Sequence, residues 1–299
     1  MIPKLASEIP KGSDWFYEVK YDGYRAKLKL QDKIELVSRN GNLLNGEFPE
    51  IVALGKYFHQ NTDVILDGEL VVLESPYKAS FYQLRNRRSL STQAQYLIFD
   101  LLVLAGKPMT KLSYTVRREL LEHWAKDVGI SQVNPSARAT YVPDQDKPTN
   151  LFQVVASTTD SNTLWDKIVQ YKGEGIIAKK NSSLWLDKRS DECLKIKNWQ
   201  YGLFVVLGYN KQNGGVYVGT VEGEEILSRG SFYHGLSPRQ RETLLAVIQD
   251  NQLKAVDNFL TVAPGICVEL RYLELYKGQL RQPAFVRFRF DINWKECIL

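Results

Sequence analysis

Strand-like runs of residues fall into two groups that meet near residue 200 of this 299-residue chain. In the first group, short runs that alternate polar and apolar residues interchange with segments of helical spacing. These runs begin at residues 15–20, 24–30 and 33–39 and continue, more apolar, at 64–73 and 96–104. The pattern predicts an α+β domain over residues 1–200 and a second domain over residues 201–299, with the boundary at residues 198–202.

Helical segments and turns complete this prediction. Residues 48–60 carry apolar side chains at helical spacing, and residues 113–129 begin with Ser113 as an N-cap and stop at Gly129. In the second group, strand-like runs lie at 203–209, 215–221, 224–230, 266–275 and 285–292, with one helical segment at 237–250. Five short strands and a single helix are typical of a small Greek-key barrel of the OB type.

Composition excludes several classes of protein. No run approaches the roughly 20 apolar residues that a membrane-spanning helix needs, and the first residues lack the apolar core of a signal peptide. We therefore expect a cytoplasmic protein that makes no contact with a membrane. The three cysteines are too far apart for a CxxC zinc pair, and we expect reduced thiols. A net charge of +5 fits nucleic acid as a partner without requiring it.

The strongest local signal is the string KYDGYR at residues 20–25. It presents Lys20 at a tight turn that contains a glycine, between two strand-like runs. A lysine amine is a nucleophile only when it is neutral, and nearby cations or burial lower its pKa. Lys195 and Lys197, two apart in a strand-like run, would supply such cations from one face of a sheet. Taken singly, these lysines also fit solvated charges on a hairpin and on an edge strand.

Carboxylates beside glycines form a second set of candidates. They occur in LDGE (66–69) and in GEGIIAK (173–179), each next to a β-rich run. Such carboxylates suit the close approach of a ligand hydroxyl or a divalent cation, but they also fit the polar end of a strand.

The combination and order of these strings resemble the successive motifs of the covalent nucleotidyltransferases. The matching strings are KYDGYR (20–25), SRNG (38–41), LDGE (66–69), FD (99–100), EGIIAKK (174–180) and KIK (195–197). This superfamily contains the ATP-dependent DNA ligases, the RNA ligases and the mRNA capping enzymes. Within it, the wording EVKYDGYR, FPEI, EGIIAKK and LRQPAF most resembles the ligase module of LigD-type bacterial ligases, which join DNA ends in nonhomologous end joining.

The resemblance implies a fold and a reaction. The fold is an ATP-grasp-like nucleotidyltransferase (adenylylation) domain at residues 1–200, followed by an OB-fold β-barrel at residues 201–299. The reaction is ATP-dependent sealing of nicks between a 5′-phosphate and a 3′-hydroxyl in duplex DNA, in DNA repair. The alternatives are an RNA ligase or capping-type nucleotidyltransferase, and a DNA-end-binding module without catalytic activity.

The same resemblance implies a role for each matching residue around the nucleotide. Lys20 would attack the α-phosphorus of ATP and carry AMP. Glu18 would read the adenine amino group, and Phe99 would stack on the adenine ring. Glu69 would bind the ribose hydroxyls, and Arg25 would contact the nucleotide.

Further residues would handle the phosphates, the metal and the DNA. Lys195 and Lys197 would bind the AMP phosphate, and Arg39 would bind the 5′-phosphate of the nick. Glu174, together with Glu69, would hold a catalytic Mg²⁺ or Mn²⁺. Two arginine-rich segments, residues 82–90 and 280–290, are candidate DNA contacts that also fit a solvated helix face and a charged edge strand.

The last motif of the family departs from its usual form. It is written RxDK or RxDR, whereas the chain has RFDI at residues 289–292. The resemblance makes Arg289 a nucleotide-binding residue, with Arg287 as a competing candidate, and the final cation is replaced by Ile292. Since this motif orients the pyrophosphate of ATP, self-adenylylation is the step that the change would affect.

The expected partners follow from the resemblance too. They are nicked duplex DNA and the proteins of end joining, including Ku, or of base-excision repair, between which the sequence does not decide. The expected state is a bacterial cytoplasmic monomer that associates with the nucleoid when bound to DNA.

Overall fold

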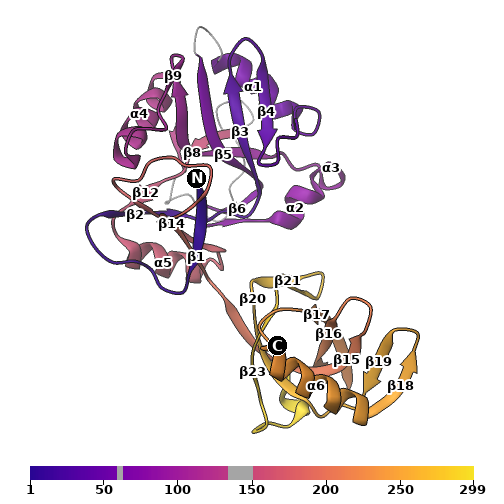
Figure 1. The fold of residues 1–299 in the computed structure, drawn as a ribbon. Helices are drawn as coiled ribbons and strands as arrows, with labels where there is room; N and C mark the ends of the chain where they lie inside the picture. The colour runs from indigo at the N-terminus through magenta and orange to yellow at the C-terminus, as the bar shows by residue number, and fades with distance from the viewer. Residues whose placement is uncertain (59–62, 134–150) are drawn as a thin grey trace. The chain divides into compact units, whose positions relative to one another are not determined.

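The structure, a computed structural model, describes residues 1–58, 63–133 and 151–299 (Figure 1). These residues form two compact units, Met1–Asn198 and Trp199–Leu299. The division falls at the first residue of the predicted boundary. The last residues of the predicted helix at 48–60 lie outside the described residues, and none of the described helices is long and apolar enough to span a lipid bilayer.

The first unit contains two sheets. Sheet A has the strand order β1-β14-β13-β2-β12, and sheet B has the order β10-β11-β8-β5-β3-β4, with β9 paired to β8. The strands of sheet A are β1 (Ile2–Ala6), β2 (Trp15–Val19), β12 (Ser157–Thr158), β13 (Gly175–Lys180) and β14 (Arg189–Lys197). The strands of sheet B are β3 (Tyr24–Leu30), β4 (Ile34–Ser38), β5 (Val64–Val71), β8 (Gln95–Leu104), β9 (Lys107–Pro108), β10 (Ser131–Gln132) and β11 (Phe152–Val154).

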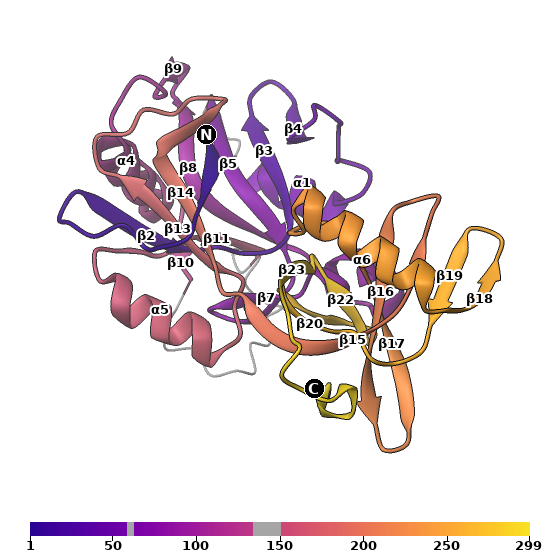
Figure 2. The ribbon, with the colours of Figure 1, turned by 60° about the horizontal axis from the view of Figure 1, so that its bottom comes forward.

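Helices cover the outer faces of these sheets. α4 packs on β8 of sheet B, and α5 packs on β2 and β13 of sheet A (Figure 2). Ser113 caps α4 as predicted, because its side chain accepts a hydrogen bond from the backbone of Val116. The helices of this unit are α1 (Pro49–Phe58), α2 (Phe81–Arg85), α3 (Arg87–Leu90), α4 (Tyr114–Asp127) and α5 (Ser161–Gln170), and a short hairpin joins β6 (Leu73–Ser75) to β7 (Lys78–Ala79).

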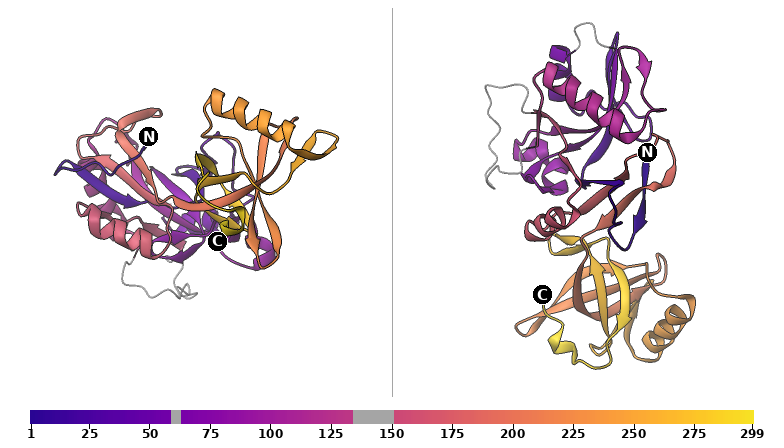
Figure 3. Two further views of the ribbon diagram at one scale, coloured as in Figure 1. Left: turned by 90° about the horizontal axis from the view of Figure 1, so that it is seen from below. Right: turned by 90° about the vertical axis from the view of Figure 1, so that its left-hand side faces the viewer.

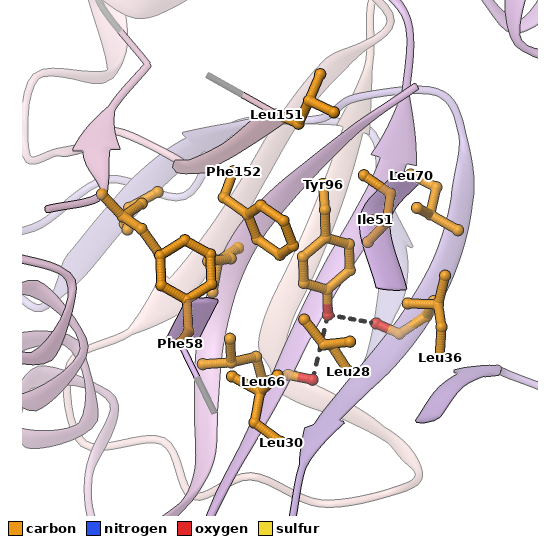
Figure 4. Packing of buried hydrophobic residues seen from close by; sticks show 14 of the residues in the cluster. Leu28, Leu30, Leu36, Ile51, Phe58, Leu66, Leu70, Tyr96, Leu151 and Phe152 are labelled. Carbon is orange, nitrogen blue, oxygen red and sulfur yellow. Dashed lines mark hydrogen bonds between the residues drawn. The ribbon is translucent and has the colours of Figure 1, made fainter. Parts of the chain in front are cut away.

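The main core of the first unit lies between sheet B and helices α1 and α4. Figure 4 shows Phe152 beside Phe58 and Tyr96, with ring centroids 5.1 and 5.9 Å from that of Phe152. The buried Tyr96 hydroxyl donates to the carbonyl oxygens of Ala26 and Leu66, so its one polar atom is satisfied. This packing fixes the strands from which the candidate residues project.

A buried ion pair joins α4 to sheet B. Arg117 is 0% exposed and donates to both carboxylate oxygens of Asp100 at 2.7 and 3.0 Å. Its third nitrogen donates to the carbonyls of Leu112 and Ser183. The guanidinium therefore connects a helix, a strand and the loop that follows β13.

We expect Arg117→Met to reduce the free energy of unfolding by about 3–5 kcal/mol, because it leaves the carboxylate of Asp100 buried without its partner. Urea denaturation followed by circular dichroism measures the effect. Lys126→Met, on the exposed face of the same helix, serves as the control and should change stability by less than about 0.5 kcal/mol. Equal stability of the two variants would contradict the prediction.

The second unit is a strongly bent antiparallel sheet with one helix. Its strands follow the order β17-β16-β15-β19-β18, and β20 pairs with both β15 and β23. The helix α6 (Pro238–Asp250) packs on β15 and β19 and lies against one side of the sheet (Figure 3). The elements are β15 (Gln200–Asn210), β16 (Gly215–Glu222), β17 (Glu225–Phe232), β18 (Gln252–Val256), β19 (Phe259–Val262), β20 (Cys267–Tyr272), β21 (Glu274–Tyr276), β22 (Gln279–Arg281), β23 (Ala284–Phe288) and the 3₁₀ turn η2 (Trp294–Glu296).

All five strands and the helix expected in this region are present, but β23 ends at Phe288, so residues 289–292 of the last expected strand lie beyond it. The hairpin of β18 and β19 was not predicted, because every residue of β18 is exposed and the strand has no buried face to produce an alternating pattern.

Candidate active site

A cavity lies between the two sheets of the first unit and is lined from both. Both sheets contribute charged side chains to its walls. Sheet A and the residue after β2 contribute Glu18, Val19, Lys20, Ile177, Lys179 and Cys193, and sheet B contributes Arg25, Asp67, Glu69, Phe99 and Asp100. Five residues from three separate predicted strings therefore meet here: Glu18, Lys20 and Arg25 of EVKYDGYR, Glu69 of LDGE, and Phe99 of FD.

The strand order of sheet A explains how the lysine motifs come together. β13 lies between β2 and β14 and runs antiparallel to both, so that Ile177 pairs with Glu18 on one side and with Lys195 on the other. One step further, the backbone amide of Lys20 donates to the Gly175 carbonyl at 2.9 Å. Paired residues of neighbouring strands share a face, so the motifs at residues 20, 174 and 195–197 converge at one end of the sheet.

Two glycines of the motifs are required by close backbone approach. A Cβ atom at Gly23 would lie 2.1 Å from the Leu70 carbonyl oxygen, and one at Gly175 would lie 2.0 Å from the Ile196 carbonyl oxygen. Gly175 also has a φ of +148°, which side chains rarely adopt. These glycines allow the turn after Lys20 to pack closely against β5 and the start of β13 to pack closely against β14.

Lys20 forms a short ion pair with Glu174. Its Nζ lies 2.6 Å from Oε2 of Glu174, and Nζ of Lys197 lies 3.8 Å from Oε1. Burial alone would lower the pKa of Lys20, but the charge and hydrogen bond of Glu174 raise it above the ordinary value. The expectation of a depressed Lys20 pKa is therefore wrong, because the nearest charge is a carboxylate rather than a cation.

The other two lysines have the shifts expected of a cationic cluster. Burial, and then the charge of Lys20, lower the pKa of Lys195, and burial also lowers the pKa of Lys197. Arg39 adds to the effect on Lys195, so the exposed guanidinium of the SRNG turn lies within electrostatic range of this cluster. A site with excess positive charge of this kind suits a phosphate group.

Glu69 lies in a carboxylate-rich part of the same site. Burial raises its pKa to about 8, and the charges of Glu174 and Asp22 act in the same direction. Burial raises the pKa of Glu174 as well. Within the part of the chain that the structure describes, no three His, Cys, Asp or Glu side chains form a ready-made metal site. A pair of mutually repelling carboxylates nonetheless fits Mg²⁺, which usually takes one or two carboxylates together with substrate phosphates.

Arg25 is held in place by Asp67. The guanidinium donates to both carboxylate oxygens at 2.9 and 2.6 Å, and it lies 5.5 Å from the centre of the Phe99 ring. Asp67 also accepts from the indole of Trp185 at 3.0 Å. Asp67 is part of the LDGE string but received no predicted role, and nothing in the sequence pointed to Trp185.

A β-bulge brings Phe99 to the cavity. In a regular strand, neighbouring residues face opposite sides, yet Phe99 and Asp100 both line this cavity. The register of β5 against β8 shifts between Asp67 and Gly68, whose partners are Asp100 and Ile98, so Phe99 is the extra residue. A bulge re-aims a side chain in this way, and strand periodicity does not reveal it.

Glu18 sits in a fully buried polar cluster. Its side chain is 2% exposed and accepts from the Tyr114 hydroxyl at 2.5 Å and from Nζ of Lys179 at 3.0 Å. Arg118 lies 4.0 Å away. Lys179 was part of the EGIIAKK string without a role of its own, and Tyr114 was predicted only as a helix residue.

Arg289 belongs to the second unit, where it pairs with Asp291. It donates to both oxygens of Asp291 at 2.8 and 2.7 Å, which lowers the pKa of Asp291 to about 2. Ile292, at the position where the family has a cation, packs with Cys267 and Cys297 in a small apolar cluster. The residue that departs from the motif therefore contributes to packing.

The first arginine-rich segment is only partly available to a ligand. Arg87 is buried, donates to the carbonyls of Leu84 and Glu47, and lies 3.9 Å from the centre of the Phe48 ring. Arg85 and Arg88 are exposed. Arg87 therefore stabilises the fold, and the other two arginines remain the candidates for DNA.

The comparisons with known proteins agree with this arrangement. The family described as ATP dependent DNA ligase domain matches residues 2–197. The chain is 32% identical to the bifunctional non-homologous end joining protein LigD of Bacillus subtilis, across 99% of this chain and 50% of that protein. It is 28% identical to the multifunctional protein of the same name from Mycolicibacterium smegmatis, across 99% of this chain and 39% of that one.

Solved structures give the same result. The ligase domain of LigD from Mycobacterium tuberculosis aligns over 99% of this chain and 97% of that domain, with a TM-score of 0.56 and 26% identity. A mycobacterial DNA ligase D solved with ATP aligns equally well. The chain spans half or less of the length of the curated LigD relatives named above. With its mixed α and β fold and its converging motifs, the chain belongs to the family of ATP-dependent DNA ligase domains found in LigD-type end-joining proteins.

Proposed function

We propose that this chain seals nicks in duplex DNA through a covalent lysyl-AMP intermediate. The observation that carries the proposal is the position of Lys20, which lines the cavity together with Glu18, Glu69 and Phe99 and contacts Glu174. A nucleophile, a carboxylate and a group of cations at the edge of one cavity are what transfer of a nucleotidyl group requires.

In the first step, the neutral amine of Lys20 attacks the α-phosphorus of ATP. An N–P bond forms, the bond to the pyrophosphate oxygen breaks, and pyrophosphate leaves. Lys195 and Lys197 stabilise the charge on the phosphate that remains. Phosphoryl transfer depends mainly on positioning and neutralisation of charge, and these residue types meet that need.

The nucleoside would be held by the residues that line the cavity. Phe99 stacks on adenine, and Glu18 accepts a hydrogen bond from the adenine amino group. Glu69 binds the ribose hydroxyls. Arg25, fixed by Asp67, contacts the nucleotide from the side of sheet B.

Glu174 and Glu69 are the residues that would hold a divalent cation, Mg²⁺ or Mn²⁺. Such an ion supplies positive charge that neutralises phosphate oxygens. If Glu174 held this cation, Lys20 would lose the ion pair with Glu174 that raises its pKa.

The later steps use the same residues on DNA. The 5′-phosphate of a nick, bound by Arg39, attacks the phosphorus of lysyl-AMP, and the N–P bond breaks to regenerate Lys20. The 3′-hydroxyl then attacks the 5′-phosphate, and AMP leaves as the strand is sealed. The exposed Arg85 and Arg88 are available for further contacts with backbone phosphates.

We assign the second unit as an OB-fold domain, on the basis of its bent antiparallel sheet and single helix. Arg289 would act on the pyrophosphate of ATP. The names of the LigD relatives point to the joining of DNA ends as the setting of this activity.

The test of this function uses α-labelled ATP or GTP with Mg²⁺ or Mn²⁺, followed by a denaturing gel and a chase with nicked DNA. Label retained from ATP and discharged into sealed DNA supports a DNA ligase. Label from GTP would indicate a capping-type enzyme, and discharge into nicked RNA alone would indicate an RNA ligase. Absence of label together with failure to seal pre-adenylylated nicks would refute the proposal.

We expect Phe99→Ala to raise the KM for ATP by about 5- to 150-fold, because loss of an aromatic stacking surface costs about 1–3 kcal/mol. Initial rates of lysyl-AMP formation at increasing ATP measure the effect. Tyr201→Ala removes an aromatic ring that is 57% exposed in the second unit, and it serves as the control. Identical KM values for Phe99→Ala and the control would remove Phe99 from the nucleotide site.

A further inference from the structure

We propose that Lys179 is a positioning residue for recognition of the base. Its ammonium group joins the carboxylate of Glu18, which would read adenine, to β8, which carries the stacking ring of Phe99. The inference rests on the proposed use of ATP and extends it to the preference for adenine over guanine. Lys179 lies in β13 and lines the cavity, yet its side chain is only 6% exposed.

The ammonium group of Lys179 connects two elements from different sheets. It lies 3.0 Å from Oε1 and 2.9 Å from Oε2 of Glu18, on β2 of sheet A. It also donates to the backbone carbonyl of Phe99, on β8 of sheet B, at 2.9 Å. An ammonium group has three hydrogens, and these three contacts can use all of them. The role proposed for Lys179 therefore does not require it to bind the nucleotide directly.

The environment of Lys179 is aromatic as well as ionic. Its Nζ lies 5.1 Å from the centre of the Phe99 ring and 4.8 Å from that of Tyr114. Tyr114 in turn donates its hydroxyl to Oε1 of Glu18. Lys179, Glu18 and the two rings therefore form one packed unit, in which a displacement of the ammonium group would shift the Glu18 carboxylate and the Phe99 ring together.

This unit determines what Glu18 offers to a base. An ionised carboxylate only accepts hydrogen bonds, which fits the amino group at position 6 of adenine. Guanine has a carbonyl oxygen at that position, which would face the carboxylate with like partial charge. Glu18 is buried, and Lys179 places a cation 2.9 Å from its carboxylate, closer than Arg118 at 4.0 Å.

Removal of Lys179 leaves the buried carboxylate of Glu18 with the Tyr114 hydroxyl as a donor and with Arg118 4.0 Å away. The contact that joins Glu18 to the Phe99 strand is then lost, and the carboxylate is no longer held in a fixed position opposite the amino group of adenine. The ATP-over-GTP preference falls as a result. A merely structural role would reduce the amount of folded enzyme and leave that ratio unchanged, since the remaining folded molecules would have an intact site.

The experiment compares three variants for lysyl-nucleotide formation with ATP and with GTP. Lys179→Met removes the ammonium group and Lys179→Arg retains a cation. Lys180→Met is the matched control on the next residue of the same strand, where the side chain is 39% exposed and lies 3.6 Å from Asp14. We expect Lys179→Met to lower the ratio of kcat/KM for ATP to that for GTP at least tenfold, mainly through KM for ATP. Lys179→Arg should recover at least a third of the ratio, and Lys180→Met should match the unmodified chain.

Tyr114→Phe keeps the experiment decisive if Lys179→Met does not fold. It removes the other donor to Glu18 while retaining the ring, and we expect a threefold or larger fall in the same ratio. Thermal unfolding of each variant reports the folded fraction. Unchanged ATP-to-GTP ratios in the folded variants would overturn the inference. Failure of the unmodified chain to form any lysyl-nucleotide would instead refute the proposed function, so the two failures are distinguishable.

Discussion

Lys20→Ala is expected to abolish formation of the covalent nucleotide adduct and, with it, ATP-dependent sealing. The variant lacks the amine that the proposal requires for attack, and the role proposed for Lys195 and Lys197 is to bind the phosphate rather than to attack it. Loss of a nucleophile typically costs several orders of magnitude in rate, and we expect a fall of at least about 10³-fold. Incubation with α-labelled ATP and a denaturing gel measures this loss.

The ion pair between Lys29 and Glu35 supplies a matched control. These side chains lie 2.8 Å apart and are about one-third exposed, away from the cavity. Lys29→Ala should therefore retain full labelling. The unfolding temperatures of Lys20→Ala and Lys29→Ala should both lie within a few degrees of that of the unmodified chain. In Lys20→Ala, Glu174 keeps Lys197 as a neighbouring cation. Sealing by Lys20→Ala at the unmodified rate would end the covalent-lysine proposal.

The sequence motifs identified residues that line one cavity, but not the groups that surround those residues. Strand periodicity placed β2, β3, β5 and β8 within a few residues, and the motifs named five of the side chains that line the cavity. Periodicity could not show that β13 inserts between β2 and β14, because pairing between distant strands leaves no local pattern. The contact between Lys20 and Glu174, and with it the raised pKa of Lys20, follows from that insertion.

Residues that act through other residues were also missed. Lys179, Tyr114 and Trp185 are spaced in the sequence like ordinary strand, helix and loop residues. Their partners are Glu18 and Asp67, which lie more than 90 residues away along the chain. The bulge at Phe99 arises from the pairing of β5 with β8. The direction in which this ring points therefore could not be predicted from the sequence either. A motif identifies which groups react, whereas the tertiary fold determines which groups hold them.

Glu174→Gln is expected to have two opposite effects on Lys20. Glu174 both raises the pKa of the Lys20 amine and is a proposed ligand for a divalent cation. Loss of its charge removes the largest influence that raises the pKa of Lys20, and leaves burial, which lowers this pKa, opposed by the weaker effects of Glu69 and Asp22. A larger fraction of the amine is then neutral at any given pH, so the metal-free and nucleotide-free chain should react faster with an amine-directed reagent.

Adenylylation should nevertheless fall at least about 100-fold in the same variant, because a proposed ligand of the divalent cation that would neutralise the transferred phosphate has been lost. Reaction of Lys20 with a small acylating reagent between pH 7 and 11, followed by peptide mass spectrometry, gives the first effect, and labelling from ATP gives the second. Glu35→Gln breaks the surface pair with Lys29 and should change neither. Parallel increases in acylation and adenylylation would show that Glu174 only restrains the amine. A more reactive amine that adenylylates more slowly would show that the carboxylate is needed in the reaction itself.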